Sequence, residues 1–281
     1  MNIKNVFREN SILYEHDVED IDVRLKKYQN QIGLSLLPNN GRKKVKAYSA
    51  SPWHGRSHTL LNSDNNDWIV IKGSGCPYLK SPYFKTPEIK NHIWGMIDGV
   101  TAENEFIKMT KMQNINIPTS KPIALKKIKK IKIEKFSPHL IYYSVKSPFR
   151  LIDLDFMNKK QKQYIKKLIS DSFPSKYKKI HLKVLDKISE IVSTLYSKKI
   201  VHNALTTHNI TCALEIVDFE ASFEINKSDE DFVEKLSLIP REIIQLHEIA
   251  FAVSWWFKES YKVYEVQKIL DRNGLLKYLN S

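Results

Sequence analysis

One stretch constrains this chain more than any other: Val201–Glu220, with the sequence VHNALTTHNITCALEIVDFE. His202 opens it, Asn209 follows seven residues later, and Asp218 follows nine residues after that. The pattern predicts a polar loop that leads into a short apolar strand, Ala213–Val217, which ends at Asp218. A carboxamide and a carboxylate brought together in this way can hold a hard divalent cation, and such a cation neutralises nucleotide phosphates. The alternative is a polar turn before an ordinary buried strand.

The stretch resembles the catalytic loop of protein kinases, followed by their metal-binding Asp. Where a kinase has its base Asp, this chain has Ala204, whose methyl group cannot accept a proton. It is more similar to the SelO (YdiU) protein adenylyltransferases, a kinase-like family whose loop reads His-Gly, two variable residues, then Thr-Asp-Asn. Thr207-His208-Asn209 falls on that Thr-Asp-Asn, and Asp218 falls on the family's metal-binding Asp. The resemblance implies that Asn209 and Asp218 hold the metal, and it puts His208 where the family has its catalytic base.

A second match lies upstream, in an apolar run that ends in a lysine and two glycines. The run, Trp68–Lys72, predicts a strand, and Thr59–Asn62 is expected to pair with it across a turn. A lysine at a strand end can direct its ammonium group at phosphates, although such a lysine is more often merely solvated. The SelO family has Lys-Gly-Ala-Gly here, which implies that Lys72, Gly73 and Gly75 bind the nucleotide, the glycines by letting backbone come close.

Apolar residues recur at helical spacing over Asp98–Asn114, which predicts a helix. In a kinase-like lobe a helix Glu pairs with the strand Lys and holds it over the nucleotide. The family motif Arg-Glu-Phe, followed twelve residues after its Glu by Ile-Pro-Thr, is matched by Asn104-Glu105-Phe106 and Ile117-Pro118-Thr119. The resemblance therefore implies that Glu105 is the partner of Lys72; the alternative is a solvent-facing helix charge.

Two strands and a phosphate-binding arginine are expected next. Ile123–Ile133 alternates apolar and lysine residues, which is typical of a strand with a wet basic face, and Leu140–Val145 is the following strand. The segment ending in Arg150 resembles the family's Ser-x-x-Arg-Phe-Gly, so Arg150 is one of two implied phosphate-binding arginines. The other falls on Tyr143, and a phenol cannot reproduce the bidentate contacts of a guanidinium.

The remainder of the chain reads as mostly helical. Helices are expected at Met157–Ile169, Ile180–Lys199 and Pro240–Lys258, the second with an apolar stripe that we interpret as core. Trp255 and Trp256 are expected in the core as well, and exposure of either would indicate a partner surface.

These elements predict an α+β, bilobal protein-kinase-like fold. Residues 1–45 are expected to form an N-terminal extension with short helices. Residues 46–150 form a β-rich, nucleotide-binding N-lobe with one regulatory-type helix. Residues 151–281 form a mostly helical C-lobe with the catalytic loop and metal site.

Charge and cysteine content bear on partners and compartment. The net charge of +14 favours acidic partners such as nucleic acid, a membrane surface or an acidic protein, but a composition biased toward Lys, Asn and Ile explains it equally. Two cysteines do not make a disulfide framework. No apolar run reaches the ~18–20 residues of a membrane span, and no Sec-type signal is evident. We expect a cytoplasmic protein, or one delivered to a host cytosol by a signal that the sequence does not reveal.

Three functions remain open. The first is an ATP-dependent and Mg²⁺- or Mn²⁺-dependent transferase, with His208 as base. SelO-family members transfer AMP to protein hydroxyls, so AMPylation of a protein substrate is implied, with phosphorylation of a hydroxyl as the alternative. The second is an inactive, nucleotide-binding pseudokinase that acts as a scaffold or regulator of a protein partner, which Ala204, His208 and Tyr143 favour. The third is a nucleic-acid-binding protein, which only the charge supports.

Overall fold

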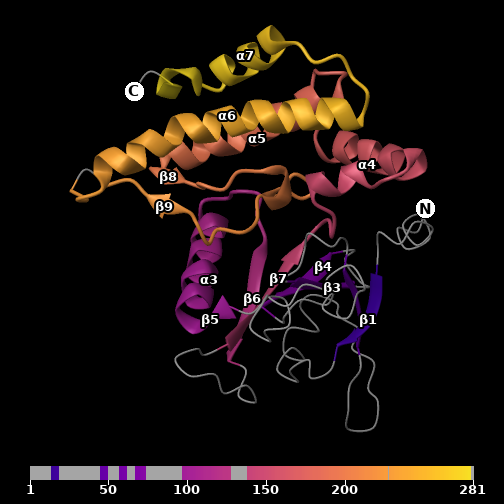
Figure 1. Ribbon diagram of the computed structural model, residues 1–281, viewed down its shortest axis with the longest axis vertical. Coiled ribbons are helices and arrows are strands. Elements are labelled where there is room, and N and C mark those ends of the chain that lie inside the picture. The colour runs from indigo at the N-terminus through magenta and orange to yellow at the C-terminus, as the bar shows by residue number, and fades with distance from the viewer. Residues whose placement is uncertain are drawn as a thin grey trace, which may run out of the picture. The chain divides into compact units, whose positions relative to one another are not determined.

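The computed structural model describes residues 14–18, 45–49, 57–61, 67–73, 97–127, 138–226 and 228–279. An antiparallel sheet in the N-terminal portion is followed by a mostly helical C-terminal region, so the fold class is α+β (Figure 1). The chain divides into two compact units between Phe149 and Arg150, and residues 111–119 belong to the second unit rather than the first. No helix within the described ranges is both long enough and apolar enough to cross a bilayer.

The first unit is built on a seven-stranded antiparallel sheet with strand order β1-β2-β3-β4-β7-β5, in which β6 also pairs with β7. Trp68–Lys72 forms β4, and its predicted pairing with the preceding strand is confirmed, with Lys72 opposite Ser57. Each residue of β4 is buried, which explains its continuous apolar run. The strands are β1 Tyr14–Val18, β2 Val45–Ser49, β3 Ser57–Leu61, β4 Trp68–Lys72, β5 Ile97–Asp98, β6 Lys121–Lys127 and β7 Pro138–Val145.

The predicted helix after Asp98 is confirmed as α3, Gly99–Asn114. Asp98 caps it: Oδ1 accepts from the N–H groups of Val100 and Thr101 at 2.9 and 3.0 Å, and Oδ2 accepts from the Thr101 hydroxyl at 2.6 Å. The Thr101 hydroxyl and N–H hold the pKa of Asp98 below its ordinary value. The helix therefore begins where a capping side chain satisfies its first N–H groups. Met109 and Met112 are buried on its inner face.

Two predictions for the first unit need adjustment. The expectation of short helices in residues 1–45 is wrong for Tyr14–Val18, which is a strand that pairs with β2; its alternating YEHDV pattern suits a strand better than a helix. Of the strand predicted at Ile123–Ile133, the structure describes Lys121–Lys127, and the rest lies outside the described residues.

The second unit packs its helices around α5, Ile180–Ser197, which contacts α4, α6 and α7. Figure 1 shows α5 beside the long α6, and α7 also packs against α5. The predicted core stripe of α5 is confirmed, because its members are all buried: Val184, Leu185, Ile188, Ile191, Val192 and Leu195. The other elements are η5 Leu151–Asp155, α4 Lys159–Ser172, β8 Ile200–Val201, η6 Thr207–Asn209, β9 Phe223–Glu224, α6 Phe232–Trp256, α7 Val263–Arg272 and η7 Leu276–Leu279.

The helix predicted to begin at Pro240 begins eight residues earlier, at Phe232, and contains Pro240 inside it. Lys235 stabilises this extra length, because its ammonium group lies 2.7 Å from Asp229 and 2.9 Å from Asp231 at the helix start. Trp256 is buried as expected, but the prediction of a buried Trp255 is wrong: its side chain is 72% exposed. Neighbouring helix residues point about 100° apart, so the pair cannot share one face.

Candidate functional site

A short hairpin in the second unit places Asn209 beside Asp218. Ile210 and Ile216 form an antiparallel bridge, and the Val217 N–H donates to the Asn209 carbonyl at 2.9 Å. Asn209, which precedes Ile210, and Asp218, which follows Val217, therefore lie at the same end of the hairpin. The spacing of nine residues between Asn209 and Asp218 is the length that this hairpin requires.

The segment predicted as a strand, Ala213–Val217, is not a regular strand. The chain turns at Thr211, whose carbonyl accepts from the Leu214 N–H at 2.9 Å, and Leu214 has a positive φ of 58°. The Thr211 hydroxyl also accepts from the Glu215 N–H at 3.1 Å. The tight turn uses up the first residues of the expected strand, which leaves only isolated bridges at Ile216.

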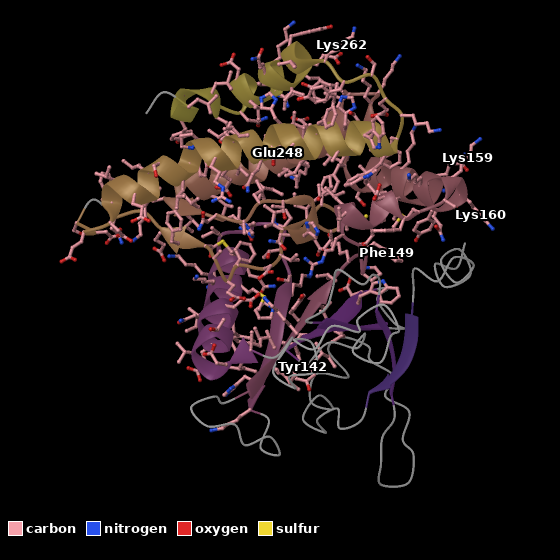
Figure 2. The ribbon with its side chains drawn as sticks, viewed as in Figure 1. Tyr142, Phe149, Lys159, Lys160, Glu248 and Lys262 are labelled. Carbon is pink, nitrogen blue, oxygen red and sulfur yellow. The ribbon has the colours of Figure 1, made fainter. Side chains whose placement is uncertain are left out.

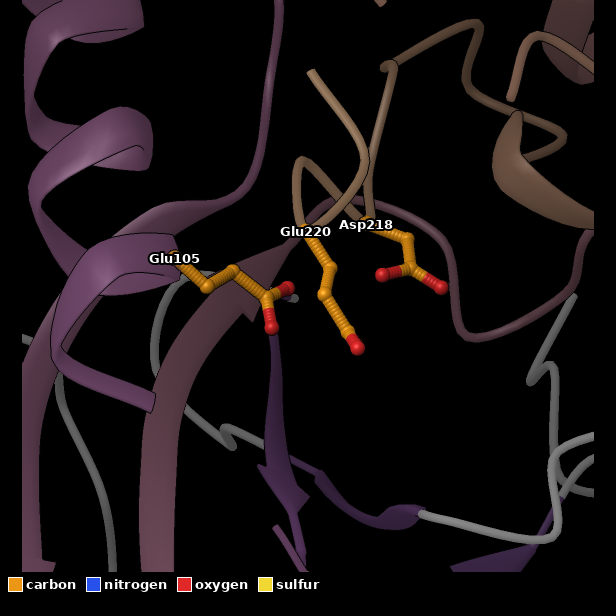
Figure 3. A group of neighbouring side chains, drawn as sticks. All are labelled: Glu105, Asp218 and Glu220. Atoms are coloured by element: carbon orange, nitrogen blue, oxygen red, sulfur yellow. The ribbon is translucent and has the colours of Figure 1, made fainter. Parts of the chain in front are cut away.

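Asp218 itself has φ +65°, a left-handed conformation that Asp adopts more readily than most L-residues. Two residues on, Glu220 is exposed, and one of its carboxylate oxygens lies within 4.8 Å of one from Asp218. Figure 3 shows the Asp218 and Glu220 side chains on this loop. Glu220 was not among the predicted site residues, although its sequence position two after Asp218 was a usable signal.

The Asn209 side chain is oriented by the loop. Its amide Nδ2 donates to the Ala204 carbonyl at 2.9 Å, which leaves Oδ1 as the atom that could ligate a cation. A carboxamide oxygen and two nearby carboxylates are hard oxygen donors, the set that Mg²⁺ and Mn²⁺ prefer. The residues present therefore fit such an ion.

Arg150 and His208 meet at the same loop. The Arg150 guanidinium donates from Nη1 to the His208 carbonyl at 2.7 Å, and the Leu151 N–H donates to the Ile210 carbonyl at 2.8 Å. The His208 side chain is exposed on η6. Four predicted site residues, Arg150, His208, Asn209 and Asp218, are thus brought together by one loop of the second unit.

His202 braces the loop and the hairpin. It is fully buried, Nε2 lies 3.1 Å from the Val217 carbonyl, and Nδ1 accepts from the Ala204 N–H at 3.3 Å. These partners require the neutral tautomer with its proton on Nε2. The ring also packs edge-on against Phe219, with centroids 4.9 Å apart. His202 therefore positions the residues on both sides of Asp218.

A buried carboxylate on α6 anchors the start of the loop, and sequence reasoning did not find it. Glu242 Oε1 accepts from the His202 N–H at 3.2 Å, and Oε2 accepts from the Tyr196 hydroxyl at 3.0 Å. Burial raises the pKa of Glu242 to about 7, and hydrogen bonds from Tyr196 and the His202 and Asn203 backbone oppose that rise. No local pattern marks Glu242, because its partners lie some forty residues away in the sequence.

The Ile117-Pro118-Thr119 motif supports the hairpin from outside. The Ile216 N–H donates to the Pro118 carbonyl at 3.0 Å, and the Thr119 hydroxyl donates to the Ile216 carbonyl at 2.7 Å. All of these residues belong to the second unit. The motif therefore has a structural task, which is to hold the strand-like residues before Asp218.

The first unit contains the ion pair that the sequence spacing indicates. Lys72 Nζ lies 2.7 Å from Glu105 Oε2, and the two side chains are 6% and 1% exposed. A buried pair of this kind costs desolvation energy, and removal of one partner leaves an uncompensated charge. The pair joins the end of β4 to α3 and fixes the direction of the ammonium group.

The close packing around Gly73 explains why a glycine follows Lys72. Gly73 has φ +89°, and a Cβ at this position would lie 2.5 Å from the His139 carbonyl oxygen and against Ile97. The glycine is therefore required by close backbone packing within the unit. Gly75 lies outside the described residues. Tyr143, which stands where the SelO family has an arginine, is buried in β7.

Neither the protein-family models nor the curated proteins that were searched contain a match to this sequence.

Proposed function

We propose that this protein is an ATP-dependent and Mg²⁺- or Mn²⁺-dependent nucleotidyltransferase that transfers AMP to a hydroxyl group of a protein, on a bilobal kinase-like scaffold. The carrying observation is the hairpin that sets Asn209 beside Asp218, with Glu220 on the same loop. The hairpin sets Asn209 next to the chain that leads to Asp218, and carboxylate oxygens of Asp218 and Glu220 lie within 4.8 Å of each other, an arrangement that a bound cation would stabilise.

Roles follow for the other residues. Lys72, held by Glu105, and Arg150 would contact phosphates, and Gly73 and Gly75 would let backbone come close to them. In the transfer step the substrate hydroxyl oxygen bonds to the α-phosphorus, the bond to the bridging oxygen breaks, and pyrophosphate leaves. His208 would accept the hydroxyl proton, for which a solvent-accessible imidazole is suited. The cation, when bound, would neutralise charge on the phosphates.

A second candidate is a nucleotide-binding pseudokinase that regulates a protein partner. One feature favours it: Ala204, at the position of the kinase base, has a methyl side chain that cannot accept a proton. Buried Tyr143 likewise supplies no guanidinium. A third candidate, phosphorylation instead of AMP transfer, uses the same residues.

Calorimetric titration with ATP tests the shared claim of metal-dependent nucleotide binding. We expect ATP with Mn²⁺ to bind, and Asp218→Ala to weaken binding at least tenfold by removing a ligand. Asp271→Ala is the matched control, because Asp271 is an exposed acid on α7, and it should leave affinity unchanged. Equal affinity with and without metal, in wild type and in Asp218→Ala, would contradict the assigned site.

A further inference from the structure

The exposed face of α6 has a regular pattern. Its exposed residues after Val233 are separated alternately by three and four positions, and we call them the α6 stripe: Glu234, Ser237, Arg241, Ile244, Glu248, Phe251 and Trp255. Figure 2 labels Glu248 on this helix. An alternation of three and four is the spacing of the seam along which one helix packs against another.

Three members of the stripe are large and apolar. Ile244 is 54% exposed, Phe251 55% and Trp255 72%. Phe251 is held in place by Tyr261, whose ring meets it edge-on with centroids 5.4 Å apart. Aromatic residues presented in this way are enriched at protein interfaces and carry much of their binding energy.

The charges in the stripe are self-complementary. Arg241 and Glu248 have opposite charges, and they lie three residues before and four residues after Ile244. If a second α6 packs antiparallel about a two-fold axis at Ile244, each Arg241 lies opposite Glu248 of the second copy. The same register puts Trp255 opposite Glu234 of the second copy, where the indole N–H can donate to a carboxylate.

We propose that the α6 stripe binds a second copy of this chain, as an antiparallel, two-fold symmetric helix pair centred on Ile244. A two-fold interface uses the same patch on both copies, so the ion pair between Arg241 and Glu248 forms twice. A register centred on Glu248 would bring two carboxylates together and is disfavoured. One helix pair is smaller than a standard interface of about 1,600 Å², so we expect a dissociation constant on the order of tens of micromolar.

Sedimentation velocity of the full chain across roughly 1–200 μM tests this. We expect reversible dimers, loss of the dimer in Ile244→Asp, and no effect of Val263→Asp, a matched exposed position on α7. Arg241→Glu and Glu248→Arg should each weaken dimerisation about tenfold, because each creates two like-charge contacts. The double variant Arg241→Glu/Glu248→Arg should restore affinity to within about threefold of wild type.

Several outcomes would overturn the proposal. Monomers at every concentration would mean that another protein, or another segment of this chain, covers the stripe. A dimer that survives Ile244→Asp would use another surface. Stronger association of Glu248→Gln, which would remove two facing carboxylates, would indicate the register centred on Glu248. A double variant as weak as the single variants would exclude the paired charges. Thermal melting of each variant confirms that it remains folded.

Discussion

The buried carboxylate of Glu242 makes a quantitative prediction about stability and pH. Its pKa is about 7 in the folded protein, mainly because of burial, against 4.5 for the group in water. Below pH 4.5 both folded and unfolded chains hold this proton. Between pH 4.5 and about 7 only the folded chain holds it, so the stability contributed by this group falls as pH rises through that window. The difference in pKa corresponds to a loss of roughly 3 kcal/mol.

Glu242→Gln removes the titration and keeps the shape of the side chain. We expect the free energy of unfolding of the wild type, relative to this variant, to decrease by roughly 3 kcal/mol between pH 4.5 and 8. Urea unfolding across that range measures it. Amide exchange at His202 should quicken in the variant at pH 8, because a neutral amide is a weaker acceptor for its N–H than a carboxylate.

Glu259 provides a control of opposite sign. Burial raises the pKa of Glu259, but hydrogen bonds from the His181 ring and the N–H groups of Ile180 and His181 outweigh it and leave the pKa below 4.5. Its contribution is therefore present above pH 4.5 and lost as pH falls through the lowered pKa.

If the free energies of unfolding of Glu242→Gln and wild type differ by a constant amount from pH 4.5 to 8, the reasoning about the burial of Glu242 is refuted.

Further predictions concern the proposed site. Lys72→Met should weaken ATP binding at least tenfold in calorimetry, because it removes the ammonium group proposed to contact the phosphates. Glu105→Gln should destabilise the first unit by roughly 3–5 kcal/mol in urea unfolding, because it leaves the buried Lys72 charge unpaired. Unchanged values would contradict the role of the pair. His208→Ala should lower turnover by about 10²–10⁴-fold with nucleotide affinity nearly intact, whereas undiminished transfer would exclude His208 as base. Faster turnover in His208→Asp would mean that the natural residue is not the base.

The sequence predicted the elements whose patterns are local. The buried run of β4 and the apolar stripe of α5 have strong periodicity, and both were placed correctly. The pairing of Lys72 with Glu105 was also accessible, because a fixed spacing linked it to a motif. The closeness of Asn209 to Asp218 followed from loop length, although the strand expected between them is a tight turn.

What the sequence did not reveal depends on tertiary contacts. The anchoring of His202 by Glu242 joins residues forty positions apart, and nothing near Glu242 marks it. The pairing of β9 with β8 joins two strands of two residues each, which are too short to show a periodic pattern. Trp255 and Trp256 are indistinguishable by composition, and only the orientation of α6 decides which is buried.

Label transfer from ATP tests the proposed function most directly. The full chain is incubated with candidate protein substrates, Mn²⁺ and ATP that carries its label on either the α- or the γ-phosphate. The account predicts metal-dependent transfer of the α label, lost in Asp218→Ala and retained in Asp271→Ala. Transfer of the γ label alone would identify a kinase, and no transfer of either label, with ATP binding intact, would contradict the transferase and favour the pseudokinase.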